Sequence, residues 1–91
     1  MSANEMSLSG SLTKETVPVL FEAGLRHLAS EDLRVDFSRV EAIDSAAVSM
    51  LLGWTRAARR GQRELHVLNL PDDLLSLARL YGVADLLPQP A

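Results

Sequence analysis

The feature that most constrains the fold is the alternation of two hydrophobic periods along the chain. Apolar residues spaced by three and four, from Val17 to Leu28, predict a helix with one buried face. Leu33, Val35 and Phe37 then alternate with charged residues, which is typical of a half-buried strand. Strands that alternate with helices favour parallel pairing through right-handed crossovers. The pattern therefore predicts an α/β fold.

The rest of the chain continues this alternation. We expect the further segments at these positions: a disordered start at 1–5, a short strand at 6–12 interrupted at Gly10, a polar loop around Val40 and Ile43, a helix at 45–60 ended by Gly61, a strand at 65–70 and a helix at 71–81 ended by Gly82. The 91 residues fit one domain. We predict a single small α/β domain over 1–91, with a short and mainly parallel sheet flanked by three to four helices.

Composition and motifs argue against several classes of function. The formal net charge is −3, so the chain lacks the basic surface that nucleic acid requires. The absence of cysteine excludes disulfides and thiolate metal sites. His27 and His66 are the only histidines, and no catalytic, metal-binding or phosphate-binding motif accompanies them. We expect no enzymatic activity, no cofactor, no metal and no nucleic-acid partner.

The most informative segment is Asp44-Ser45, which joins the predicted loop to the start of the 45–60 helix. Two interpretations are open. Either side chain can satisfy the free backbone N–H groups at the helix start, which is a structural role. Alternatively, Ser45 is displayed at the positive end of the helix, where a partner group or a phosphate is favoured.

The 45–60 helix is apolar around most of its circumference, apart from a polar strip that begins with Ser45 and Ser49. A few aliphatic residues suffice to face the sheet, which leaves Met50 and Trp54 on the far flank. Either a neighbouring helix covers these two side chains, or they form an exposed apolar patch with a tryptophan anchor. The second arrangement is typical of a partner site.

Two segments before this helix carry a family resemblance. VDFSRV at 35–40 and IDS at 43–45 lead into an apolar helix. This order resembles the signature of STAS domains, the domains of sulfate transporters and anti-sigma factor antagonists. The resemblance runs from about Leu8 to Leu87. It implies a STAS fold that works by binding a partner protein, with Ser45 at or near the contact.

The C-terminal part narrows the resemblance. LARLYGV at 77–83, with Leu86 and Leu87 after it, is similar to the MlaB-type STAS subunit of the Mla ABC transporter for phospholipids. That likeness implies a cytoplasmic accessory subunit that binds the transporter's ATPase at the inner face of the inner membrane. There it supports assembly and activity and helps to maintain outer-membrane lipid asymmetry. This hypothesis assigns partner binding to five residues: Asp44, Ser45, Ser49, Met50 and Trp54.

An alternative hypothesis within the same family is a regulatory switch of the anti-sigma factor antagonist type, phosphorylated on Ser45 by a partner kinase.

Two departures from the family pattern bear on both hypotheses. Ala46 and Ala47 stand where the family usually has a glycine, which stiffens the helix start. The N-terminus has room for little more than one strand in place of the usual hairpin. The exposed sheet edge that results can pair with another chain, so a homodimer is among the expected assemblies.

Overall fold

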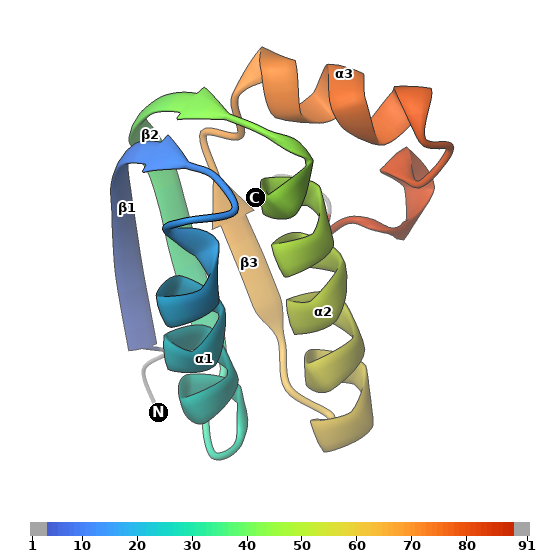
Figure 1. Cartoon of the computed structure of the whole chain (residues 1–91). Helices are drawn as coiled ribbons and strands as arrows, with labels where there is room; N and C mark the ends of the chain where they lie inside the picture. The colour runs from blue at the N-terminus through green and yellow to red at the C-terminus, as the bar shows by residue number, and fades with distance from the viewer. Residues whose placement is uncertain (1–3, 89–91) are drawn as a thin grey trace.

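The sheet has three parallel strands in the order β1-β2-β3. The computed structural model describes residues 4–88. Figure 1 shows its elements: β1 (Asn4–Leu12), α1 (Val17–Leu28), β2 (Leu33–Ile43), α2 (Ser45–Gly61), β3 (Leu65–Leu68), α3 (Asp72–Leu80) and a short 3₁₀ helix (Ala84–Leu86). The α1 and α2 helices cover one face of the sheet, and α3 lies at the end where the strands finish. The predicted α/β class and parallel sheet are confirmed.

The core lies between the sheet and the α1 and α2 helices. Leu33, Val35 and Phe37 of β2 are at most 1% exposed. Arg34, which lies between two of them, is exposed on the other face because successive strand residues point to opposite sides. The alternation in this strand therefore places its apolar side chains under the helices.

The N-terminal strand is longer than the sequence predicts. Asn4 and Glu5 belong to β1, so the expectation of a disordered start is wrong for these two residues, while 1–3 lie outside the described residues. Gly10 has a positive φ of 73° beside an irregularity in the pairing with β2. The strand nevertheless continues to Leu12, so the glycine accommodates a bulge and does not interrupt the strand.

The second strand runs through the region that the sequence predicts as a polar loop. The main chain of 39–43 pairs with β1 as far as Leu12. Backbone hydrogen bonds need no apolar side chains, so exposed residues such as Arg39 and Glu41 can remain in the strand. The extension carries the chain directly to Asp44 and the start of α2.

Two other boundaries shift slightly for backbone reasons. β3 ends at Leu68, before the predicted end, and Asn69 after it has a left-handed φ of 59°. α2 includes Gly61, and Gln62 takes the left-handed C-cap position, with φ 57°, that the sequence suggests for the glycine.

The α1 and α2 helices interlock through two glycines. A Cβ added at Gly24 of α1 would overlap the ring of Trp54, and a Cβ added at Gly53 of α2 would overlap the ring of Phe21. The indole Nε1 of Trp54 also donates a hydrogen bond to the Phe21 carbonyl oxygen, at 3.0 Å. We call these four residues the α1–α2 seam. The seam fixes which side of α2 faces α1 and which side faces solvent.

Candidate functional site

Asp44 follows β2 directly and is the N-cap residue of α2. Its Oδ1 accepts a hydrogen bond from the Ala46 backbone N–H at 2.7 Å, and its Oδ2 accepts one from the Lys14 backbone N–H at 3.1 Å. Its own backbone N–H donates to the Leu12 carbonyl oxygen at 3.0 Å. Asp44 therefore holds the β1–α1 loop against the start of α2. Of the two capping candidates in the sequence, the aspartate makes the cap.

Ser45 and Ser49 lie one turn apart on the outer side of α2, and both are exposed. Ser45 is the first residue of the helix, and no acidic residue lies in the first turn. The free N–H groups of a helix start give this end a partial positive charge. Because Asp44 makes the cap, the Ser45 hydroxyl is displayed at that end without being needed to close the helix. Whether a partner contacts these serines stays a prediction.

Met50 and Trp54 do not form the exposed patch that one interpretation of the sequence proposes. Met50 is 1% exposed and Trp54 is fully buried. The Trp54 ring packs on Gly24, which has no side chain to obstruct it, and its N–H is paired with a backbone carbonyl in α1. Assigning these two residues to a partner surface is therefore wrong for this conformation. The sequence signal for the burial of Trp54 is Gly24, whose missing side chain makes room for the ring.

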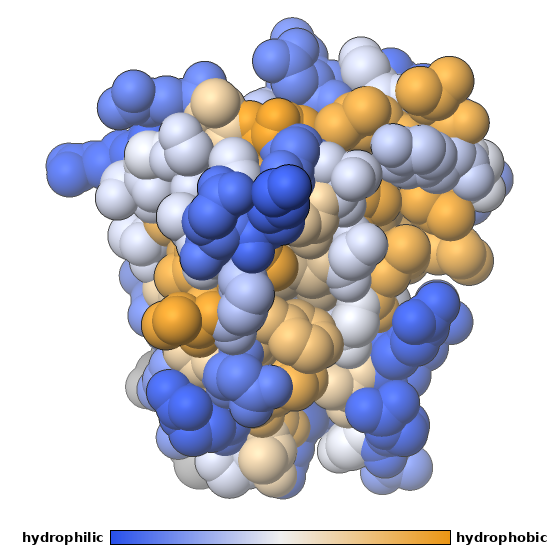
Figure 2. All heavy atoms as spheres, viewed as in Figure 1, coloured by the Kyte–Doolittle hydropathy of each residue, from blue (hydrophilic) through white to orange (hydrophobic). Residues whose placement is uncertain are grey.

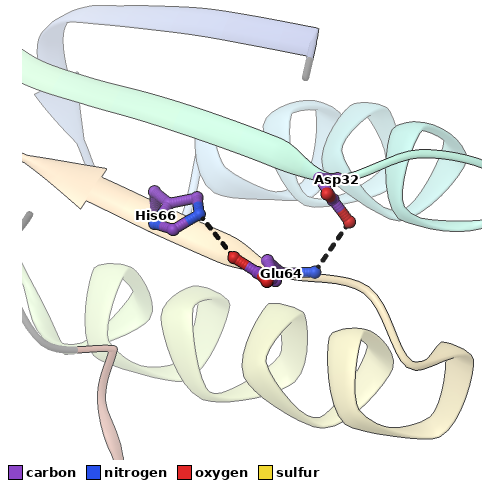
Figure 3. A network of polar contacts seen from close by, with 3 residues as sticks. All are labelled: Asp32, Glu64 and His66. Carbon is purple, nitrogen blue, oxygen red and sulfur yellow. Dashed lines mark hydrogen bonds and ion pairs between the residues drawn. The ribbon is translucent and has the colours of Figure 1, made fainter. Parts of the chain in front are cut away.

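A further polar network joins β2 to β3 at the end of the sheet opposite Ser45. Figure 3 shows Glu64 between Asp32 and His66: the Asp32 Oδ1 accepts from the Glu64 backbone N–H at 2.9 Å, and the His66 Nε2 lies 3.0 Å from the Glu64 Oε1. The His66 and Glu64 side chains are 43% and 71% exposed, so this pair adds little to stability. Strand pairing brings the three residues together, and no sequence motif predicts this network. Their contacts secure the strands.

The aspartate of the VDFSRV segment also has a structural partner. Asp36 Oδ1 accepts hydrogen bonds from the side-chain amide of Asn69, at 3.0 Å, and from the Ser38 backbone N–H, at 2.9 Å. The bond from Asn69 and then that from Ser38 lower the pKa of Asp36 below its ordinary value, because both favour the ionised carboxylate. Asp36 thus links β2 to the residue that follows β3.

Within residues 4–88, no group of three or more His, Cys, Asp or Glu side chains is placed to hold a metal ion. No helix in that same part of the chain is long and apolar enough to cross a membrane.

Comparison with known proteins assigns the family. The family model described as "Mlab, STAS domain" matches residues 2–88. The chain belongs to the STAS domain family. This STAS domain is 28% identical over 85 residues to the anti-sigma-B factor antagonist of Staphylococcus aureus (strain NCTC 8325 / PS 47). The matched region covers 91% of this chain and 79% of that protein. The anti-sigma-B factor antagonist of Staphylococcus epidermidis is 26% identical with the same coverage.

A solved structure shares the fold. The anti-sigma factor antagonist SpoIIAA in its unphosphorylated form matches with a TM-score of 0.75 and 18% identity, over 100% of this chain and 83% of that one. At this identity the match shows the fold of this STAS domain.

These relatives overturn the interpretation of the chain as an accessory subunit of a phospholipid transporter. Both sequence relatives are anti-sigma-B factor antagonists. The family model carries the Mlab name, but none of these proteins supports the finer assignment to the MlaB type or an ABC ATPase as partner. The 77–83 segment behind that interpretation forms the end of α3, where Leu77 and Ala78 pack on the core. Leu80 and Tyr81 of the same segment are exposed, so packing accounts for only part of that likeness.

Proposed function

We propose that this STAS domain is a non-catalytic, cytoplasmic regulator of the anti-sigma factor antagonist type, which binds an anti-sigma factor until Ser45 is phosphorylated. The observation that carries the proposal is the exposed Ser45 at the first position of α2, beside a cap that Asp44 makes alone. The similarity to anti-sigma-B factor antagonists over most of the chain supports the same function.

Phosphorylation at this position changes the surface without dismantling the fold. A kinase transfers the γ-phosphoryl group of ATP to the Ser45 Oγ: a P–O bond forms at Oγ, the bond to the β-phosphate oxygen breaks, ADP leaves, and the hydroxyl proton passes to a base of the kinase. The phosphate brings a charge of about −2, which the positive end of α2 favours. Because the cap does not use the serine hydroxyl, α2 keeps its start. The added charge therefore acts on the partner contact.

The proposed contact surface consists of Ser45 and the β1–α1 loop at Lys14, both of them exposed, and Ser49 lies one turn along α2, outside it. Asp44 positions this surface by holding the Lys14 backbone beside the helix start. Lys14 is the only lysine in the chain, so it supplies a positive charge close to the proposed phosphorylation site. Met50 and Trp54 have no place in this surface, because both are buried.

The proposal is tested by affinity purification of the full chain from its native cells, with Ser45→Asp and Ser49→Asp variants beside the unmodified protein. We expect an anti-sigma factor to co-purify with the unmodified protein and the Ser49→Asp variant, and to be lost with Ser45→Asp. Incubation of the purified complex with ATP should place phosphate on Ser45, as mapped by mass spectrometry. Recovery of a different class of partner, or phosphate at another residue only, overturns the proposal.

A further inference from the structure

The exposed apolar side chains of this domain are concentrated at one place. Four large hydrophobic residues are exposed in the described part of the chain, and three of them lie within 80–86: Leu80 at 76%, Tyr81 at 54% and Leu86 at 47%. The fourth, Val19 at 75%, stands alone on α1. Figure 2 shows apolar side chains gathered at the upper right, over α3 and the segment after it. A single exposed residue needs no explanation, whereas a cluster often marks an interaction surface.

Packing does not account for the cluster. α3 buries Leu74 and Ala78, which lie four residues apart on one side of the helix. Leu80 lies two residues, about 200° around the helix, after Ala78 and so projects from the opposite side, away from the core. A polar residue at position 80 would satisfy the fold equally well.

Two opposite charges accompany the apolar side chains. Arg79 immediately precedes Leu80, and Asp85 immediately precedes Leu86. Both charged residues line one shallow hollow with Gly82 and Ala84. Among residues 4–88 the ion pairs are Arg34–Glu5 and His66–Glu64, so neither charge of the hollow is neutralised by a salt bridge in the described part of the chain. A surface that carries an apolar centre with one positive and one negative charge is complementary to a copy of itself.

We propose that this α3 patch, made of Arg79, Leu80, Tyr81, Asp85 and Leu86, binds a second copy of the chain around a two-fold axis. In such an interface the same surface is used by both copies, so Arg79 of each copy faces Asp85 of the other. The apolar side chains cover one another between the two charge pairs. The proposal does not depend on the proposed function, because it uses no residue of the Ser45 surface.

The patch is small, so the dimer is weak and its formation depends on protein concentration. Sedimentation velocity of the full chain from about 10 µM to about 1 mM covers the expected range. We expect a rise in mass for the unmodified protein and for Val19→Glu, the matched exposed control. Leu80→Glu should weaken association about tenfold or more. A protein that stays monomeric throughout, or a dimer that Leu80→Glu leaves unchanged, overturns the proposal.

Charge reversal tests the two-fold pairing itself. Arg79→Asp and Asp85→Arg should each weaken the dimer, because each places like charges opposite one another. A mixture of the two single variants should associate like the unmodified protein, since every facing pair in the mixed dimer is again of opposite sign. Circular dichroism checks that each variant is folded. Failure of the mixture to associate overturns the pairing, as does loss of a co-purifying anti-sigma factor with these variants while the unmodified protein stays monomeric.

Discussion

The two sides of α2 differ in what they tolerate and in what they can do. One side carries Met50 and Trp54, which are both buried, and Trp54 is held against α1 through the seam. The other carries Ser45 and Ser49, which are exposed and free of packing duties. Change on the first side alters stability, whereas change on the second alters only what the surface presents. Because the start of α2 is capped without its exposed serine, a charge can be added to that serine without loss of the fold.

The largest expected effect is at Trp54. Trp54→Ala removes a buried ring and leaves the Phe21 carbonyl without its indole donor. We expect a loss of about 3–5 kcal/mol in the free energy of unfolding. Chemical denaturation followed by circular dichroism measures it. A loss below about 1 kcal/mol would place Trp54 outside the core and remove the contrast between the two sides of α2.

The seam predicts a smaller effect at Gly24. Gly24→Ala places a methyl group inside the Trp54 ring, so one helix must shift. We expect a loss of about 1–3 kcal/mol by the same measurement. Gly61→Ala is the matched control, because its added Cβ meets no atom closer than 3.5 Å. Equal losses in the two variants would show that helix packing at Gly24 is loose.

Asp44 lies between the two sides and supports the exposed one. Asp44→Ala removes the acceptor for the Ala46 and Lys14 backbone N–H groups. We expect a loss of about 0.5–2 kcal/mol, as is usual for a helix cap. Amide exchange at the two N–H groups should rise together. Protection that stays unchanged at Lys14 would mean that the aspartate does not hold the loop.

The smallest expected effect is at Ser45 itself. Ser45→Ala should change the free energy of unfolding by no more than about 0.5 kcal/mol, as expected for an exposed side chain that makes no cap. Ser49→Ala serves as the comparison on the same side of the helix. A clearly larger loss of stability for Ser45→Ala than for Ser49→Ala would show that the Ser45 side chain has a structural role.

The parts of the fold that side-chain patterns determine could be predicted from the sequence. The apolar stripe of α1 and the alternation at Leu33, Val35 and Phe37 each indicate the element and its buried face. The second half of β2 could not be predicted in this way, because Arg39 and Glu41 break the alternation while the backbone still pairs with β1.

The candidate site likewise has features that local sequence determines and features that depend on residues elsewhere in the chain. Asp44-Ser45 could be placed at a helix start because capping is a local property. The burial of Trp54 depends on Gly24, which lies on another helix, so the composition of α2 alone leaves two outcomes open. The identity of a partner is even less local, because the exposed residues Leu80 and Tyr81 within segment 77–83 do not by themselves show what binds them.

The central claim is that a negative charge at Ser45 controls partner binding while the fold stays intact. Isothermal titration calorimetry of the co-purified anti-sigma factor with the unmodified protein, Ser45→Asp and Ser49→Asp tests it most directly. The account predicts a loss of affinity of at least about tenfold for Ser45→Asp, roughly 1.4 kcal/mol, with cooperative unfolding retained. It predicts a much smaller loss for Ser49→Asp. Equal affinities for all three proteins would contradict the claim.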